Sequence, residues 1–337
     1  MEALVCSSPG VLELQRRAAP LRGPGDALVR PLTVGICGTD YHIYEGKHPF
    51  LQYPRVMGHE LAVEVVEAPD GSGFEQGEVC VVNPYLSCGT CVACRVGKPN
   101  CCVRISVLGV HQDGGMTSEL VLPVRNLVHA PGLSVDACAT VEFLSIGAHA
   151  VNRSGGTSGQ RGLVIGAGPI GLGVALFASV SGVAVTMMDI DDARLKVAGE
   201  IVGATTVRAG DGAQEQVAAL TDGEGFDLVF DATGNATSMQ RGFDFVTHGG
   251  TYVLVSVVKD HIGFEDPDFH KKEMSLLGSR NATNADFRLV MDAIRSGQIP
   301  IERLITHRTT LPHAATDLPA WATDKNGLIK GVIEIAS

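Results

Sequence analysis

Residues 162–171, Gly-Leu-Val-Ile-Gly-Ala-Gly-Pro-Ile-Gly, decide the fold of this chain. The apolar start of the stretch predicts a buried strand, and the alanine-rich sequence that follows predicts a helix. Between them, Gly166 would make a tight turn, Gly168 would let the backbone approach a pyrophosphate, and Gly171 would permit close packing of helix on strand. The first turn of such a helix offers unpaired N–H groups to an anion. The stretch therefore predicts a dinucleotide-binding turn.

A second predicted strand supplies the acidic residue that this turn needs. Residues 183–188 follow the helix, and the run ends at Asp189, near the position about 20 residues after the glycines where a carboxylate holds the adenosine ribose. Because a carboxylate would repel the additional phosphate of NADP, we predict NAD as the cofactor. Arg194 either stacks against the adenine or is a solvated residue at the start of the next helix.

Further along, residues 229–234 and 249–253 have the pattern of later strand ends in the same sheet, and their glycines would line the nicotinamide side. Asp231 is better explained as a helix cap or a turn residue than as a ligand. The predicted cofactor-binding residues are Gly166, Gly168, Pro169, Ile170, Gly171, Asp189, Arg194, Thr233 and Gly234.

Length and composition predict two domains. The chain has 337 residues, of which 45% are hydrophobic, enough for two cores. Short valine and leucine runs up to about residue 140 predict a β-rich barrel. The later alternation of strands and helices predicts a doubly wound parallel sheet, so the fold class is α/β. We expect the ligands to bind in a cleft between the domains.

Charge and hydropathy exclude several functions. Acidic residues outnumber basic ones by 37 to 26, which gives a net charge of -11. The sequence has no dense run of lysine and arginine that could bind the phosphates of a nucleic acid. No segment is apolar enough to span a membrane, and the first residues lack a secretory signal, so we expect a cytoplasmic protein.

Four cysteines, Cys88, Cys91, Cys94 and Cys102, follow the spacing Cys-x2-Cys-x2-Cys-x7-Cys. Four thiolates at this spacing suit one structural zinc ion. A disulfide set is disfavoured in a reducing compartment, and the sequence lacks the Cys-x3-Cys-Pro ending of a bacterial iron–sulfur run. Free thiols on a loop are the remaining alternative. A nucleic-acid-binding zinc ribbon would need a basic surface, which the composition does not supply.

A second set of possible ligands is spread along the first half of the chain. Residues 35–42 contain Cys37, residues 58–60 contain His59, and Glu142 lies much later. These three residues offer a thiolate, an imidazole and a carboxylate, which suits a catalytic zinc that keeps its fourth position open. Taken singly, each is better explained as a buried packing residue.

Taken together and in this order, the motifs resemble those of the zinc-dependent medium-chain alcohol and polyol dehydrogenases over nearly the whole chain. The resemblance implies Cys37, His59 and Glu142 as ligands of the catalytic zinc, with Glu60 as a nearby carboxylate that can approach the metal. It also implies about two zinc ions per chain. The implied domains are a GroES-like catalytic domain (1–148) with the zinc lobe (88–102), a Rossmann NAD-binding domain (149–281), and a C-terminal segment (282–337) that returns to the catalytic domain.

The resemblance also assigns roles in the chemistry. A hydroxyl bound to zinc would lose its proton to Thr39, and the proton would pass through the cofactor ribose to His42 and then to water. The alternative for His42 is a surface histidine. Asp40 would accept the second ring proton of His59 and so orient that ligand.

Residues 105–115, 268–273 and 278–283 further resemble the sugar-acid branch of the family, particularly L-galactonate 5-dehydrogenases. There are two departures from the pattern of polyol enzymes. Phe143 stands where a proline usually follows the glutamate, and Val63 replaces a common glycine. We therefore expect a local difference in the barrel and in the placement of the glutamate.

The predicted function is oxidation of a secondary hydroxyl of a sugar acid or polyol to a ketone with NAD, and an aldonate such as L-galactonate is favoured. His111 and Arg280 are candidates for the substrate carboxylate, although His111 alternatively caps a loop and Arg280 alternatively contacts cofactor or another subunit. A sorbitol, polyol or L-threonine dehydrogenase is the alternative. A zinc-free quinone reductase or a non-catalytic cofactor-binding protein would lack these metal residues. The resemblance implies a homodimer or homotetramer.

Overall fold

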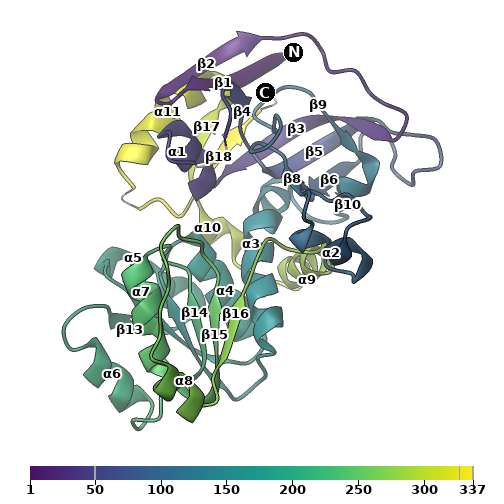
Figure 1. The fold of residues 1–337 in the computed structure, drawn as a ribbon. Coiled ribbons are helices and arrows are strands. Elements are labelled where there is room, and N and C mark those ends of the chain that lie inside the picture. The colour runs from purple at the N-terminus through teal and green to yellow at the C-terminus, as the bar shows by residue number, and fades with distance from the viewer. Residues whose placement is uncertain (49–50, 326, 336–337) are drawn as a thin grey trace. The chain divides into compact units, whose positions relative to one another are not determined.

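The structure is a computed structural model that describes residues 1–48, 51–325 and 327–335. The chain forms two compact units, drawn in Figure 1. Unit 1 comprises Met1–Glu142 and Thr283–Ser337, and unit 2 comprises Phe143–Ala282. The first division falls between Glu142 and Phe143, within helix α3 (Val135–Ser154). The boundary predicted from the sequence, after residue 148, lies further along the same helix. One continuous helix serves both units, so no change in sequence pattern marks the boundary.

Unit 1 is built on a seven-stranded sheet in the order β10-β6-β5-β3-β18-β17, with β9 also paired to β3. Its strands are β3 (Asp26–Ile36), β5 (Glu60–Glu67), β6 (Val79–Val82), β9 (Leu120–Pro123), β10 (Leu127–His129), β17 (Ile305–Thr310) and β18 (Lys330–Glu334). The last strand of the described chain, β18, lies antiparallel beside β3. The C-terminal segment therefore completes the sheet that the N-terminal segment begins.

Smaller elements surround this sheet. A three-stranded sheet contains β1 (Glu2–Ser8), β2 (Val11–Arg16) and β4 (Arg55–Val56), and a two-stranded sheet contains β7 (Tyr85–Leu86) and β8 (Ser106–Val107). The helices are α1 (Gly38–Tyr44), α2 (Val92–Arg95), α9 (Asn284–Arg295), α10 (Ile301–Leu304) and α11 (Leu311–Thr323), with 3-10 turns at Pro99–Cys101 and Val124–Asn126. Leu4, Leu61 and Leu318 belong to one buried cluster, so α11 packs on the core that the strands form.

Unit 2 contains a parallel sheet of six strands in the order β13-β12-β11-β14-β15-β16. These strands are β11 (Arg161–Ile165), β12 (Ala184–Asp189), β13 (Thr205–Arg208), β14 (Phe226–Asp231), β15 (Val246–Leu254) and β16 (Ser275–Gly278). The first strand is central, and the order reverses beside it, which is the doubly wound arrangement of a dinucleotide-binding sheet. The structure confirms this predicted fold.

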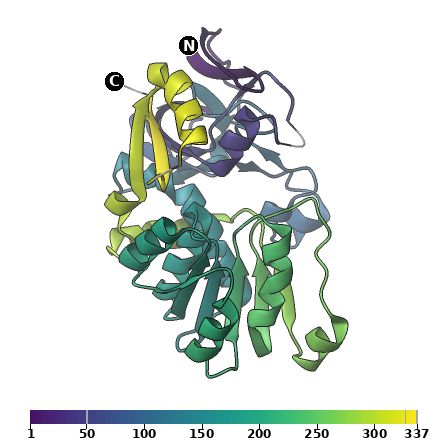
Figure 2. The ribbon, with the colours of Figure 1, turned by 90° about the vertical axis from the view of Figure 1, so that its left-hand side faces the viewer.

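Helices connect these strands and lie on both faces of the sheet, as Figure 2 shows. They are α4 (Pro169–Val180), α5 (Asp192–Val202), α6 (Ala213–Leu220), α7 (Ala236–Arg241) and α8 (Asp266–Lys271), with a 3-10 turn at Gly242–Phe245. Leu163, Val164 and Ile165 of the central strand are buried, as expected for a strand covered on both faces. Within the described ranges, no helix is both long and apolar enough to cross a lipid bilayer.

Candidate metal and cofactor sites

Cys37 and His59 are brought together at adjacent strand ends in unit 1. Cys37 follows β3 and caps the N-terminus of α1, and His59 immediately precedes β5, the neighbour of β3. Glu60 is the first residue of β5. One ligand atom from each of Cys37, His59 and Glu60 lies within 4.8 Å of the other two. The structure thus gathers a sulfur, a nitrogen and an oxygen donor at one point.

Asp40 ties the two segments that carry these ligands. Its carboxylate is buried and accepts the backbone N–H of Cys37 at 2.9 Å and the backbone N–H of Gly58 at 3.2 Å. Asp40 Oδ1 lies 3.8 Å from Nδ1 of His59, which is longer than a hydrogen bond. Asp40 therefore positions both ligands through the backbone, and the predicted contact with the His59 ring is an electrostatic one in this structure.

Glu142 and Glu60 have different partners. Glu142, on α3, accepts a hydrogen bond from the phenol of Tyr85, and burial raises the pKa of Glu142 to about 7. Glu60 instead accepts two hydrogen bonds from the ammonium of Lys330, at 2.8 and 2.7 Å. Glu142 is not one of the three residues whose ligand atoms lie within 4.8 Å of one another. Its role as the third ligand stays a prediction.

The electrostatics of this group fit a bound cation. Asp40, Glu60 and Glu142 are all buried, with Lys330 as the buried ammonium among them. Burial by itself would lower the pKa of His59, but the surrounding anionic groups, led by Asp40, raise it well above its ordinary value. Nδ1 of His59 is buried without a hydrogen-bond partner among the described residues. A site that attracts positive charge and offers sulfur, nitrogen and oxygen suits zinc.

The residues predicted to act on protons and substrate lie in less buried places. The thiol of Cys37 donates to the hydroxyl of Thr39 over 3.8 Å, so Thr39 adjoins the ligand group. His42 is exposed in the last turn of α1. His111 is exposed, and its Nδ1 accepts the backbone N–H of Val107 at 3.1 Å, which is a loop contact. Arg280 is an exposed residue of unit 2.

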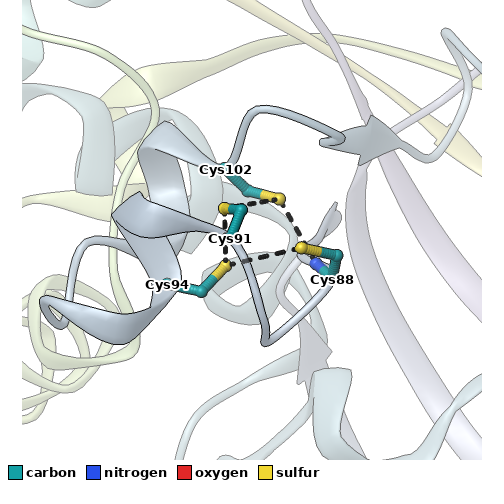
Figure 3. Close-up of side chains that lie close together, drawn as sticks. All are labelled: Cys88, Cys91, Cys94 and Cys102. Atoms are coloured by element: carbon teal, nitrogen blue, oxygen red, sulfur yellow. Dashed lines mark hydrogen bonds between the residues drawn. The ribbon is translucent and has the colours of Figure 1, made fainter.

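The four cysteines of the lobe converge around one point, as Figure 3 shows. Their sulfur atoms lie 3.5 Å (Cys91 to Cys94), 3.8 Å (Cys91 to Cys102) and 4.0 Å (Cys88 to Cys94) apart. Sulfur ligands around a tetrahedral zinc would lie roughly 3.8 Å apart, whereas bonded sulfurs would lie about 2.0 Å apart. The lobe therefore has the geometry of a four-thiolate metal site and not of a disulfide pair.

Hydrogen-bond donors around the lobe favour a thiolate at Cys88, whereas desolvation and the neighbouring cysteines raise the pKa of Cys94 to about 11. Cys102 Sγ accepts the backbone N–H groups of Cys88 and Arg104, and Cys88 Sγ accepts the Arg104 guanidinium at 3.2 Å. Backbone hydrogen bonding, above all from Thr90, lowers the pKa of Cys88 to about 5. A thiol that ionises this readily is ready to bind a metal at neutral pH.

The glycine turn of unit 2 has the features that its three glycines predict. Gly166 has a φ of +100°, and a Cβ on Gly171 would collide with the carbonyl oxygen of Gly166. At Gly168, by contrast, a Cβ would meet nothing within 4 Å. Gly166 and Gly171 are thus required by the fold itself. The open space over Gly168, at the N-terminus of α4, is available to a phosphate group.

Asp189 ends β12 beside this turn and is held firmly. Its carboxylate accepts the backbone N–H of Ala167 at 2.6 Å and that of Asp191 at 2.9 Å. A carboxylate has about four acceptor positions, so two hydroxyl groups could still bind. Arg194 is half-exposed, and its Nε lies 3.8 Å from Asp191.

Asp231 organises the next strand end, where Thr233 and Gly234 are exposed. Its buried carboxylate accepts hydrogen bonds from the backbone and hydroxyl of Thr233 and from Ser238, which confirms the turn role expected for it. The structure therefore places the predicted cofactor residues at or near the carboxyl ends of β11, β12 and β14, where the cofactor binds in doubly wound sheets.

Tyr85 and Lys330 also belong to the site, although the sequence motifs do not indicate a role for either residue. Tyr85 lies shortly before the first cysteine of the lobe, and Lys330 begins the C-terminal strand Lys330–Glu334, where Gly, Val and Ile follow it. A lysine in such a strand is the available signal, because a buried ammonium needs a specific partner. Nothing in the sequence pointed from Tyr85 to Glu142.

Comparison with known proteins identifies the class. Residues 23–132 match the model of the alcohol dehydrogenase GroES-like domain, and residues 169–296 match the model of the zinc-binding dehydrogenases. The chain belongs to the zinc-type medium-chain alcohol dehydrogenase family. It is an oxidoreductase that acts on CH–OH groups, which confirms the predicted reaction class.

Three known proteins show which members it is similar to. L-galactonate-5-dehydrogenase of Escherichia coli K12 is 40% identical over 335 residues, with 99% of this chain and 98% of the relative covered. The crystal structure of the alcohol dehydrogenase rspB from Escherichia coli CFT073, complexed with NADH, matches with a TM-score of 0.92, 30% identity and 99% of both chains covered. The structure of a zinc-binding dehydrogenase from Sinorhizobium meliloti 1021, bound to NADP, matches with a TM-score of 0.89 and 28% identity over 99% of this chain and 98% of the other.

Proposed function

We propose that the protein oxidises a secondary hydroxyl of an aldonate, with L-galactonate favoured, to a ketone, and that NAD accepts the hydride. The observation that carries this proposal is the group of half-buried Cys37 and buried His59 and Glu60 in a chain that is 40% identical over nearly its full length to an L-galactonate-5-dehydrogenase. The donor types favour metal-assisted chemistry, and the relative favours the substrate class.

Cys37, His59 and Glu142 would hold the catalytic zinc, with Glu60 within reach of it. The four cysteines of the lobe would hold a second, structural zinc, which gives about two per chain. When bound, the catalytic zinc lowers the pKa of a hydroxyl group and NAD supplies the hydride acceptor. Proton transfer, cofactor selection and binding of the substrate carboxylate would be carried out by side chains of this chain.

Thr39 and His42 are the residues proposed to move the proton. Thr39 adjoins Cys37, so its hydroxyl would accept the proton that the substrate hydroxyl releases. His42 is exposed in the last turn of α1 and would pass a proton to water. Their separation along the helix matches one turn, which puts both side chains on one face.

The cofactor preference and the substrate carboxylate involve unit 2. Asp189 favours NAD because its carboxylate would bind the two ribose hydroxyls and repel a 2′-phosphate. Arg280 is the candidate for the substrate carboxylate, since a guanidinium can bind both of its oxygens. His111 is the weaker candidate, because its Nδ1 is occupied by the loop contact with Val107. We also propose a cytoplasmic homodimer or homotetramer.

A screen of NAD reduction followed by absorbance tests this proposal. The substrates are L-galactonate, L-gulonate, sorbitol and L-threonine, and we expect the highest kcat/KM with L-galactonate. A preference for sorbitol or L-threonine would move the protein to the polyol or the amino-alcohol branch. Metal analysis should find about two zinc ions per chain, and a chain with one ion or none would contradict the catalytic metal site.

A further inference from the structure

Lys330 is a lysine that the fold buries completely. Only 1% of its side chain is exposed, and its ammonium donates to both carboxylate oxygens of Glu60 and, at 3.1 Å, to the backbone carbonyl of Ile36. Taking an ammonium out of water is costly unless its hydrogen bonds are satisfied, and three acceptors match its three N–H groups. The carboxylate of Glu60 is therefore the charged partner that allows the ammonium of Lys330 to be buried.

The register of three strands explains how these two side chains meet. Glu60 of β5 pairs with Gly35 of β3, and Gly331 of β18 pairs with Ile36 of β3. A side chain on Gly35 would collide with the carboxylate of Glu60, and its Cβ would lie 2.9 Å from the Cβ of Glu60. The missing side chain at Gly35 thus leaves the space through which Glu60 reaches the ammonium on the other side of β3.

Glu60 and Glu142 are both within electrostatic reach of His59, but they differ in what holds them. Glu60 is neutralised by the ammonium of Lys330, whereas Glu142 is held by the uncharged phenol of Tyr85. Removing one partner from a buried ion pair leaves an uncompensated charge, which is more costly than giving up one hydrogen bond from an uncharged donor. The carboxylate that moves more easily onto a cation is therefore Glu142.

We propose that Lys330 is a positioning residue that holds Glu60 back from the catalytic metal, so that Glu142 serves as the carboxylate ligand. This inference rests on the proposed metal site. By withholding the second carboxylate, Lys330 leaves one coordination position for the substrate oxygen. Without the ammonium, Glu60, whose oxygen already lies within 4.8 Å of the ligand atoms of Cys37 and His59, becomes an additional ligand.

The test measures the ligands directly in cobalt-substituted protein. Cys37→Ala supplies the spectrum of the four-cysteine lobe, and subtracting it leaves the spectrum of the catalytic site. We expect Lys330→Met to give weaker visible bands, as five-coordinate cobalt does relative to four-coordinate. We also expect slower loss of this metal to a chelator, on the order of tenfold. A merely structural role for Lys330 would instead loosen the metal.

The double variant Glu60→Gln/Lys330→Met is the matched control. It removes both charges of the pair, so no buried ion is left alone, and it removes the carboxylate that would bind the metal. We expect its spectrum and its metal release to return to those of the wild type. A Lys330→Met protein with the wild-type spectrum, or with metal release as fast as or faster than that of the wild type, would overturn the inference.

Two further results keep the inference separate from the proposed function. If Lys330→Met does not fold, the double variant Glu60→Gln/Lys330→Met decides, because it leaves no buried charge alone and a residue that is not a ligand in the wild type can be changed without faster metal release. Faster release from this double variant would overturn the role of Lys330. A wild-type protein with no cobalt signal above that of Cys37→Ala would instead refute the proposed metal site itself.

Discussion

The glycine turn of unit 2 and the ligand group of unit 1 are assembled in opposite ways. The turn is one continuous stretch, 162–171, completed by Asp189 from the next strand, and local conformation fixes most of it. The ligand group draws Cys37, His59, Glu60 and Glu142 from separate segments, and only the sheet register and α3 bring these segments together. The turn is therefore a continuous site, whose geometry depends on a few neighbouring backbone atoms. The ligand group is an assembled site, whose geometry depends on the fold of the whole unit.

The largest expected effect is a loss of turnover that affects the ligand group of unit 1 and leaves NAD binding at the glycine turn of unit 2 unchanged. Cys37→Ala removes the thiolate ligand, and we expect NAD-dependent turnover to fall by about three orders of magnitude or more, since metal assistance supplies several kcal/mol and each 1.4 kcal/mol is tenfold. NAD binding, measured by fluorescence titration, should not change. Cys6→Ala is the matched control, because Cys6 is a buried cysteine outside both ligand groups. Turnover that survives in Cys37→Ala would refute the role of the metal.

The four-cysteine lobe tests whether a continuous metal site acts on stability and not on chemistry. Cys91→Ala should lower the free energy of unfolding by about 4 kcal/mol, the size typical of a lost structural metal, and should remove one zinc ion per chain. Thermal unfolding and metal analysis measure the two effects. Cys101→Ala is the control, since Cys101 is exposed and its sulfur is not in the four-sulfur group. Unchanged stability in Cys91→Ala would mean that the lobe holds no structural ion.

The sequence predicted the continuous regions better than the assembled one, for a physical reason. The roles of Gly166 and Gly171 follow from steric rules that act within a few residues, and the lobe shows its ligands by spacing alone. The partners of the two glutamates depend on contacts such as Glu60 with Lys330, which are separated by most of the chain. Residue type gives no information about such a pairing until the strand register is known.

The division of the chain shows the same limit. The change from short strands to alternating strands and helices marked the second domain, and the order of the parallel sheet confirmed its fold. The boundary itself lies within α3, between Glu142 and Phe143. A continuous helix carries no break in hydrophobic period, so the pattern could not locate the point where it leaves unit 1.

Substitutions at Gly171 and Gly168 should affect different properties, stability in the first case and NAD binding in the second. Gly171→Ala places a methyl group against the carbonyl of Gly166 and should cost about 3 kcal/mol of stability, as overpacking does. Gly168→Ala faces open space, so it should leave the unfolding temperature nearly unchanged and weaken NAD binding. Thermal unfolding and NAD titration of both variants test this contrast. Equal stability of the two variants would contradict the predicted packing role of Gly171.

The smallest effect concerns the choice of cofactor at Asp189. Asp189→Asn removes the negative charge, so we expect KM for NAD to rise about tenfold, because a hydrogen bond to a charged group contributes roughly 1.5 kcal/mol. Use of NADP should improve, since the repulsion of its 2′-phosphate is relieved. The measurement is kcat/KM for both cofactors with one substrate, and metal content should stay as in the wild type.

This variant also tests how far the two regions are independent. Asp189 accepts two backbone N–H groups, and asparagine keeps only one acceptor oxygen, so part of any loss could come from a loosened turn. Thermal unfolding distinguishes the causes, because a loosened turn lowers stability and weakens both cofactors alike. If the ratio of NAD to NADP activity does not change, charge at Asp189 does not select the cofactor. The preference would then have to come from groups beyond the turn, and the continuous site would be less self-contained than its sequence indicates.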